Sequence, residues 1–238
     1  MSGKKLLVIG AHAADFVWRS GGVIAAVVAA GGAVESVALS FGERGESGEL
    51  WEIAGQTVDN VKTVREQEAR AAAAVLGANL TCMDLGDYPL EVGRDALERM
   101  ANIIRDFGPD IVITHAPRDP LNPDHPVAHA YAVKAVQLAT GAGRASAFPT
   151  IRQPVVLMFE PHYPESSDFK PDLYVDVTGV HGRKAEAMAA ITSQRYMPAY
   201  QTERSQQRGW QARRLSGDRS IEFAEVFQRF LPEVIHQL

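Results

Sequence analysis

Short apolar runs alternate with longer amphipathic segments along most of the chain. The runs have the length of buried strands, whereas the longer segments repeat their apolar residues at helical spacing. Strands are predicted at residues 6–10, 33–40, 80–85, 110–114, 155–159 and 174–177. Helices are predicted at residues 16–30, 60–76, 95–107, 126–140, 183–192 and 202–214. The glycine- and glutamate-rich stretch at residues 41–55 is predicted to be a loop.

This alternation indicates the fold class. Strand followed by helix, repeated through the first 160 residues, favours an α/β protein whose mostly parallel sheet is covered by helices on both faces. No internal repeat or low-complexity linker divides the sequence. We therefore expect a single domain over residues 1–238.

Composition narrows the functional classes. Apolar residues make up 46% of the chain and charged residues 22%, and the formal net charge of -5 argues against a nucleic-acid partner. The single cysteine, Cys82, excludes an intrachain disulfide, fits a reducing compartment and is expected to be inert inside its strand. Residues 1–5 lead directly into the first strand, and no apolar run approaches the roughly 20 residues of a membrane span. These features predict a cytoplasmic protein without a membrane partner.

A polar pair follows the first predicted strand. His12 and Asp15 lie three residues apart on the turn that leads into the first helix. Open α/β sheets bind ligands at the carboxyl ends of their strands, and histidine with carboxylate is a common pair of zinc ligands. The alternative is structural, with Asp15 as the N-cap of the helix and His12 filling the turn.

A second polar cluster follows the strand at residues 110–114, which His115 ends. It runs from Arg118 to His129 and can face the first cluster in a doubly wound sheet. His125 could supply a third metal ligand, leaving an open position for water or substrate, and Asp124 could orient a neighbouring ligand. Alternatively, Asn122 and Asp124 are turn and cap residues. We expect His129 to be a histidine on the helix surface.

These two clusters resemble the signature motifs of the LmbE/PIG-L family, A-H-P-D-D-E and H-P-D-H, which is best known for zinc-dependent deacetylases of N-acetylglucosamine type. The matching segments are residues 11–16 and 122–125, and residues 65–68 and 76–77 extend the likeness. The resemblance implies a Rossmann-like three-layer sandwich. It also implies one zinc ion per chain, with His12, Asp15 and His125 as ligands.

Three positions depart from the deacetylase pattern. Ala14 stands where the family has its general base, Phe16 replaces the following glutamate, and Asn122 replaces the first histidine of H-P-D-H. An amide hydrolase would lose about 10²- to 10⁴-fold for each missing group. Deacetylation of an N-acetyl sugar, with Glu46 in place of the missing base, is therefore the weaker hypothesis. A non-catalytic metal-binding protein is a further alternative.

The chain is similar to the 4-oxalomesaconate hydratases of the same superfamily, also called 4-carboxy-2-hydroxymuconate hydratases. The similarity includes the departures at Ala14 and Asn122. Residues 11–22, 39–51, 119–126 and 159–165 carry this resemblance. It implies a hydro-lyase that adds water to a small unsaturated tricarboxylate and yields 4-carboxy-4-hydroxy-2-oxoadipate in gallate and protocatechuate 4,5-cleavage. Family members commonly form trimers or hexamers, so the resemblance also implies a homo-oligomer.

Hydration needs a group that moves a proton, and the loop after the second strand offers carboxylates. The resemblance points to a glutamate of this loop as base, and we favour Glu46 over Glu43, although both could be solvated loop charges. His162, after the fifth strand, could shuttle a proton, bind a carboxylate or form a structural turn. Tyr196, Tyr200 and Trp210 are expected in packing or subunit contacts.

A tricarboxylate also needs several cations, ideally arginines in bidentate geometry. The candidates for substrate binding are Arg44, Arg19, Arg118, Asn122, Arg204 and Arg208. The sequence does not select the metal, because two histidines and an aspartate also accept iron, manganese or cobalt.

Overall fold

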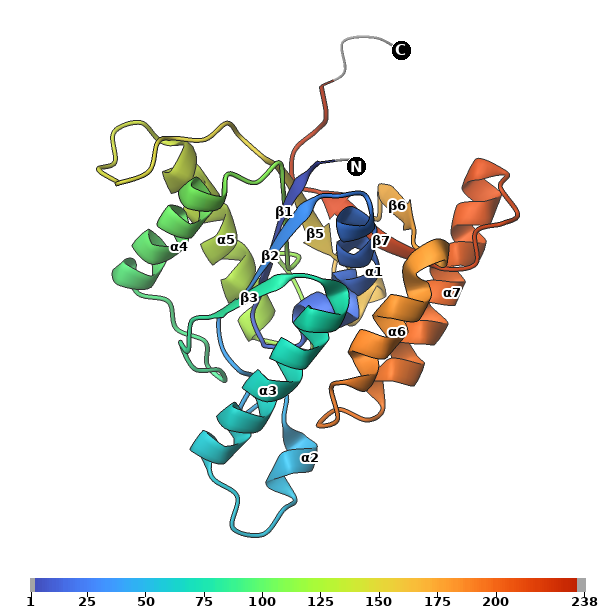
Figure 1. The fold of residues 1–238 in the computed structure, drawn as a ribbon, viewed down its shortest axis with the longest axis horizontal. Helices are drawn as coiled ribbons and strands as arrows, with labels where there is room; N and C mark the ends of the chain where they lie inside the picture. The colour runs from blue at the N-terminus through green and yellow to red at the C-terminus, as the bar shows by residue number, and fades with distance from the viewer. Residues whose placement is uncertain (1–2, 235–238) are drawn as a thin grey trace.

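A seven-stranded sheet runs through the middle of the molecule, with helices on both faces (Figure 1). The computed structural model describes residues 3–234. The strands are β1 (Lys5–Gly10), β2 (Ala33–Ala38), β3 (Asn79–Cys82), β4 (Ile111–Thr114), β5 (Val155–Phe159), β6 (Leu173–Asp176) and β7 (Ala224–Arg229). Their order is β3-β2-β1-β4-β5-β7-β6, with β1 to β5 parallel and β7 antiparallel to both of its neighbours. The expected mostly parallel α/β sheet is confirmed.

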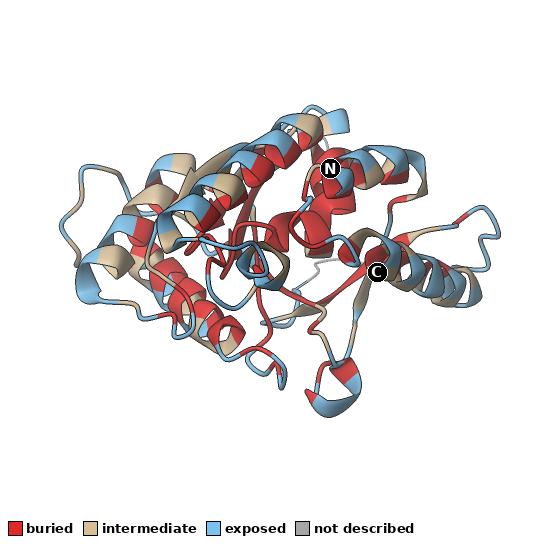
Figure 2. Ribbon diagram, turned by 90° about the horizontal axis from the view of Figure 1, so that it is seen from below, coloured by how far each residue is buried: buried red, intermediate tan, exposed pale blue. Residues whose placement is uncertain are grey.

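The helices form two layers. They are α1 (Asp15–Ala29), α2 (Gly48–Trp51), α3 (Val58–Leu76), α4 (Arg94–Phe107), α5 (Asp124–Thr140), α6 (His181–Ala189) and α7 (Met197–Ser216). Helices α4 and α5 cover one face, and α1, α3, α6 and α7 cover the other (Figure 1). Figure 2 shows buried residues along the sheet and on the inward sides of the helices.

The alternation of side chains along β1 explains this layering. Leu6 and Val8 belong to the hydrophobic core beneath α1, α3 and α6, whereas Leu7 and Ile9 belong to the core beneath α4 and α5. Successive strand residues point to opposite faces, so a run that is apolar at every position requires helices on both sides.

The predicted elements agree with the structure except near the end of the chain. The predicted strands all occur, and most helix bounds shift by one or two residues. The last helix, predicted at residues 202–214, begins earlier, at Met197, and strand β7 was not predicted. The loop predicted at residues 41–55 contains the short helix α2.

The sheet order also predicts where a ligand binds. The chain passes from β1 outward to β2 and β3, then returns to place β4 on the other side of β1. The loops after β1 and β4 therefore diverge to opposite sides, which opens a crevice at the carboxyl edge of the sheet. Both histidine clusters of the sequence follow these two strands.

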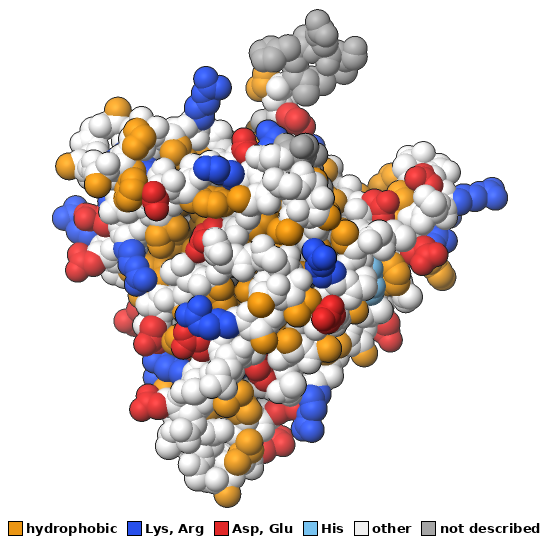
Figure 3. All heavy atoms as spheres, viewed as in Figure 1, with side chains coloured by type: hydrophobic (Ala, Val, Ile, Leu, Met, Phe, Trp, Pro, Cys, Tyr) orange, Lys and Arg blue, Asp and Glu red, His pale blue; other side chains and the backbone are white. Residues whose placement is uncertain are grey.

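The surface gives two further observations. On the face shown in Figure 3, lysine and arginine side chains are interspersed with aspartate and glutamate. Within residues 3–234, no helix combines the length and apolar character that crossing a membrane requires.

Candidate metal centre and active site

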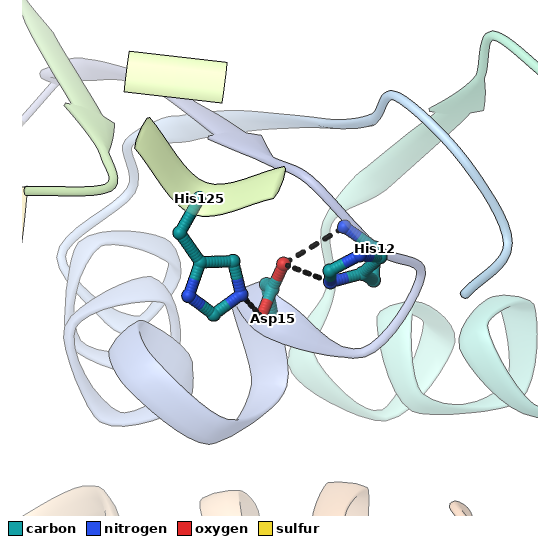
Figure 4. Close-up of side chains that lie close together, drawn as sticks. All are labelled: His12, Asp15 and His125. Atoms are coloured by element: carbon teal, nitrogen blue, oxygen red, sulfur yellow. Dashed lines mark hydrogen bonds and ion pairs between the residues drawn. The ribbon is translucent and has the colours of Figure 1, made fainter. Parts of the chain in front are cut away.

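The two polar clusters meet beyond the carboxyl ends of β1 and β4. One potential ligand atom from each of His12, Asp15 and His125 lies within 4.8 Å of the other two. Figure 4 shows both rings beside the Asp15 carboxylate, with His12 Nδ1 3.5 Å from Oδ2 and His125 Nε2 3.8 Å from Oδ1. Two imidazoles and one carboxylate form a donor set of catalytic zinc sites. The fold thus brings the predicted ligands together, while their role as ligands stays a prediction.

The hydrogen bonds of the two rings leave one nitrogen of each available. His12 Nε2 donates to Asp124 Oδ2 at 3.1 Å, and His125 Nδ1 donates to Asp119 Oδ2 at 2.8 Å. These bonds assign the tautomers and leave the lone pairs on His12 Nδ1 and His125 Nε2. Both atoms are buried and make no hydrogen bond within residues 3–234. Such orphaned acceptors beside a carboxylate fit a bound metal ion.

The charges around the cluster favour a cation. Burial lowers the pKa of His12, but the carboxylates of Asp124, Asp15 and Glu46 outweigh that effect and raise this pKa to about 10. Burial holds the pKa of His125 well below its usual range. The carboxylates therefore stabilise a positive charge at His12. A proton or a metal ion on Nδ1 can supply that charge, so the two compete for this atom.

His115 belongs to the same cluster, although the sequence analysis assigned it no role. Its Nε2 lies 3.1 Å from Asp15 Oδ2 and accepts the backbone N–H of Ala11 at 3.0 Å. Its ring stacks on that of His125 with 3.9 Å between centroids. The available signal was its position directly after a strand, which it shares with His12.

His129 is buried, so its expected place on the helix surface was wrong. Its side chain packs under the loop after β4, and only 9% of the residue is exposed. Nδ1 donates to the backbone carbonyl of His115 at 2.8 Å, which ties α5 to that loop. This bond gives His129 a structural role outside the ligand set.

The loop after β2 carries Glu46 to the cluster of His12, Asp15 and His125. Gly42 has φ of +71° and approaches so closely that a Cβ there would lie 2.9 Å from Glu46 Cβ and 3.2 Å from His12 Cβ. A side chain at this position would be strained and would push the loop outward. Asp87 accepts the backbone N–H groups of Arg44 and Gly45 at 3.0 and 2.7 Å and fixes the loop from below.

The Glu46 carboxylate faces the cluster and is held at both oxygens. Oε1 lies 3.7 Å from His12 Nδ1 and accepts Nδ2 of Asn122 at 2.7 Å. Oε2 accepts Nε2 of Gln194 at 2.9 Å. Glu46 and Gln194 also line an open pocket of about 340 Å³ at the surface. Sequence reasoning missed Gln194, because it lies far along the chain from Glu46.

Glu43 and Arg44 face each other on the same loop. The Glu43 side chain is fully buried, and its Oε1 lies 3.3 Å from Arg44 Nη1 and 3.8 Å from Lys62 Nζ. Burial raises the pKa of Glu43, with the Asp87 carboxylate adding to that effect. Half of the Arg44 side chain is exposed. These contacts anchor the loop on the side of Asp87 and α3.

His162 lies on the other side of the cluster. Its Nδ1 is 3.1 Å from Asp119 Oδ2, and its ring is parallel to that of His125 with 5.3 Å between centroids. Asp119 thereby bridges a predicted ligand and a predicted catalytic residue, a role that the sequence did not reveal. Arg19 Nη2 lies 3.2 Å from the ring of His162, and Arg19 Nε lies 3.4 Å from Asp15 Oδ1.

The remaining candidate arginines already bind carboxylates of the chain. Arg204 Nη1 donates to Glu160 Oε1 at 2.8 Å, and Arg208 Nε donates to Oε2 at 3.3 Å. Arg118 is mostly exposed and pairs with Asp168 at 3.1 Å. Substrate binding by these arginines stays a prediction.

Comparison with known proteins identifies the family. Residues 7–136 match the family model described as PIG-L: GlcNAc-PI de-N-acetylase. The chain belongs to the PIG-L family. This PIG-L member is 41% identical to 4-oxalmesaconate hydratase of Pseudomonas putida KT2440, over 99% of the chain and 92% of the relative. The crystal structure of GalB, the 4-carboxy-2-hydroxymuconate hydratase of that strain, matches 99% of both chains with a TM-score of 0.95 and 41% identity.

Deacetylases of the PIG-L family are more distant relations. A 1D-myo-inositol 2-acetamido-2-deoxy-α-D-glucopyranoside deacetylase of Catenulispora acidiphila is 30% identical over 63% of this chain and 57% of that protein. The N,N'-diacetylchitobiose deacetylase of Pyrococcus horikoshii shares the fold, with a TM-score of 0.79 at 20% identity over 95% of this chain and 84% of that one.

The structure explains how the departures from the deacetylase motif are accommodated. Ala14 and Phe16 are each 2% exposed, and both belong to the hydrophobic core beneath α1. Asn122, which stands in place of the motif histidine, donates its amide to Glu46. The carboxylate next to the cluster thus comes from the loop after β2.

Proposed function

We propose that this PIG-L member is a zinc-dependent hydratase that adds water to the carbon–carbon double bond of 4-oxalomesaconate, a tautomer of 4-carboxy-2-hydroxymuconate. The product is 4-carboxy-4-hydroxy-2-oxoadipate, formed in gallate and protocatechuate 4,5-cleavage. The observation that carries the proposal is the 41% identity to a 4-oxalmesaconate hydratase, which extends over 99% of the chain.

His12, Asp15 and His125 would hold the zinc ion, one per chain. The free lone pairs on His12 Nδ1 and His125 Nε2 support this assignment. When bound, the ion supplies a Lewis acid that polarises an oxygen atom of water or of the substrate. Asp124 and Asp119 keep the two imidazoles in the orientation and tautomer that binding requires.

Glu46 acts in this proposal as the general base. Its carboxylate takes a proton from water as the new C–O bond forms at one alkene carbon, and a proton is added to the neighbouring carbon. Two observations support Glu46 as the base. Two amide donors orient its carboxylate, and the open pocket gives water and substrate access to it. Glu43, buried against Arg44 and Lys62, is the second candidate.

His162 acts as the second proton-transfer group. Its side chain is about one quarter exposed at 24%, and Asp119 orients its Nδ1. Both features suit a group that exchanges protons with solvent and substrate. Six residues are proposed to bind the tricarboxylate substrate. They are Arg44, Arg19, Arg118, Asn122, Arg204 and Arg208.

We further propose that the enzyme works in the cytoplasm as a trimer or hexamer. The single cysteine supports a reducing compartment. Tyr196 and Trp210, which were expected in packing or subunit contacts, are 64% and 68% exposed, whereas Tyr200 packs partly against the core. Exposed aromatic side chains of this size are common in subunit interfaces.

The test is a spectrophotometric assay with enzymatically generated 4-carboxy-2-hydroxymuconate. We expect loss of the dienol absorbance, abolition of activity by a chelator and recovery with zinc. Glu46→Gln should lower kcat by about 10²- to 10⁴-fold, whereas Glu98→Gln, an exposed glutamate on α4, should match the wild type. Stable absorbance with one zinc bound per chain would refute this substrate. Release of acetate from an N-acetyl sugar would then support the deacetylase alternative.

A further inference from the structure

Gln194 connects the candidate base to a buried support. It lies in the segment between α6 and α7 and is only 2% exposed. Its Nε2 donates to Glu46 Oε2 at 2.9 Å, while its Oε1 accepts Arg65 Nη1 at 3.0 Å and Trp18 Nε1 at 3.4 Å. The side chain thus joins α1, α3 and the loop after β2 at one point.

The neighbours of Gln194 allow one orientation of its amide. Arg65 and Trp18 can only donate, and an ionised Glu46 can only accept. A flipped amide would place its NH₂ group against two donors and its oxygen against a carboxylate. The Gln194 NH₂ group must therefore face Glu46, and its oxygen must face Arg65 and Trp18.

Asn122 is oriented in the same way on the opposite oxygen. Its Oδ1 accepts the backbone N–H of Asp124 at 3.0 Å, which turns Nδ2 towards Glu46 Oε1 at 2.7 Å. Each oxygen of Glu46 thus receives one amide donor that cannot rotate away. This arrangement fixes the plane of the carboxylate beside His12.

Helix α3 fixes the segment that delivers Gln194. Arg65 is 1% exposed and also donates to the Phe41 carbonyl at 3.1 Å and to Ser193 Oγ at 2.8 Å. One turn later, Glu68 Oε1 accepts the backbone N–H groups of Thr192 and Ser193, both at 2.9 Å. Two side chains on one face of α3 therefore determine where residues 192–194 lie.

We propose that Gln194 is a positioning residue for the base Glu46, and that Arg65 locks its amide for that purpose. This inference rests on the proposed hydratase function of the same site. Within residues 3–234, the Gln194 side chain makes hydrogen bonds with Trp18, Arg65 and Glu46 and none with the predicted metal ligands. It acts by holding the Glu46 carboxylate in the orientation that takes a proton from water.

The expected effect is large on turnover and small on binding. Hydrogen bonds to charged groups contribute about 1.5–3 kcal/mol, which corresponds to roughly 10- to 150-fold. A carboxylate released at one oxygen rotates among several rotamers, and a misplaced catalytic group costs rate. Gln194→Met, which keeps the length and removes the amide, should lower kcat about 10- to 100-fold with KM within about threefold.

The experiment compares Gln194→Met with Gln207→Met, an exposed glutamine on α7, in the hydratase assay. We expect Gln207→Met to match the wild type and both variants to retain full zinc content. Arg65→Lys keeps the charge but loses the fork of donors, so it should reproduce part of the Gln194→Met defect. Equal kcat for Gln194→Met and the wild type would overturn the inference.

A double-mutant cycle separates positioning from general support of the fold. In the Glu46→Gln background, Gln194→Met should change kcat by less than about twofold, because no carboxylate remains to be oriented. An undiminished loss in that background would refute the inference. Crystal structures give a readout that is independent of activity, since Glu46 should occupy a different rotamer in Gln194→Met. If the wild type does not hydrate the substrate, the proposed function fails, while an unchanged Glu46 rotamer would refute the positioning role.

Discussion

At the scale of single residues, the Asp15 carboxylate joins the parts of the site. Its Oδ2 accepts the backbone N–H of His12 at 2.8 Å and lies 3.1 Å from His115, while Oδ1 lies 3.4 Å from Arg19. An aspartate that served only as an N-cap would satisfy the backbone N–H groups of its own helix. Asp15 also contacts His115, directly after β4, and His125 on α5, and these contacts favour the interpretation as a ligand over that of a cap.

The ligand set and its supports should differ in their effect on metal binding. Alanine at His12, Asp15 or His125 should abolish stoichiometric zinc binding. Asp124→Ala should lower zinc affinity only about 10- to 100-fold, because it removes the hydrogen bond that orients His12 and leaves the donors in place. Competition with a chromophoric chelator measures both effects. Asp168→Ala, an exposed carboxylate outside the cluster, is the control, and an equal loss there would contradict the assignment.

Cys82 should react slowly with thiol reagents. Burial raises the pKa of its thiol to about 11, compared with the ordinary value of 9.0. The thiolate is the reactive form, so its fraction falls about tenfold for each pH unit below the pKa. The rate of alkylation should therefore still rise between pH 9 and 10, where a free thiol such as glutathione levels off. A plateau near pH 9 in the folded protein would contradict this prediction.

The sequence revealed some of the site residues and not others for a physical reason. His12, Asp15 and His125 follow apolar strands, and the ends of parallel strands must meet at one edge of the sheet. Asp119 also lies after β4, but its contacts could not be inferred from that position, and Gln194 follows no strand. Their partners lie far away along the chain or in the same irregular loop, so only the folded structure shows what they bind.

At the scale of secondary-structure elements, β7 shows why a strand can escape prediction. A charged residue at its second position, Glu225, breaks the apolar pattern of a buried strand, yet it is only 4% exposed. Its Oε1 accepts Lys184 Nζ at 2.8 Å, and its two oxygens accept the backbone N–H groups of Gly22 and Val23 at 2.8 Å. Partners on α1 and α6 compensate the burial of this charge, and the local sequence does not reveal them.

The same substitution should have opposite effects in two helices. A Cβ at Gly209 in α7 would lie 2.2 Å from the backbone oxygen of Glu222, whereas a Cβ at Gly182 in α6 would have no neighbour within 4 Å. Gly209→Ala should therefore destabilise the protein by about 1–3 kcal/mol, because α7 must move away from the chain before β7. Gly182→Ala should stabilise it by about 0.4–1 kcal/mol.

Chemical unfolding in urea measures both changes, and the Gly182 variant serves as the control for the effect of alanine in a helix. A stabilising Gly209→Ala would show that α7 and the segment before β7 do not pack as closely as the structure indicates.

At the scale of the whole molecule, the site divides between the part of the chain that matches the family model and the part beyond it. The region that matches the PIG-L family model, residues 7–136, contains the three predicted ligands and Glu46. His162 and Gln194 lie beyond it, on the loops after β5 and α6. The likeness to the hydratase covers both parts, since it extends over 99% of the chain.

The proposed assembly gives a prediction at this scale. Light scattering coupled to gel filtration should give three or six times the 25.8 kDa mass of the chain. Trp210→Glu should shift the distribution towards smaller species if α7 contributes to the interface, because a charge in an apolar contact is costly to bury. Gln137→Glu, at an exposed position on α5 in the opposite helix layer, is the control. A monomer at all concentrations would contradict the proposal.

The position of β7 between β5 and β6 also has a consequence during synthesis. The ribosome releases both neighbours first, and neither has its final partner β7 until residues 224–229 arrive. A chain stopped after α7 would carry every proposed metal ligand and yet present two unpaired strand edges. Open edges recruit other chains, so such a fragment should aggregate. Pairing of β7 with β5 and β6 should therefore protect the folded sheet, and with it the proposed metal site, from aggregation.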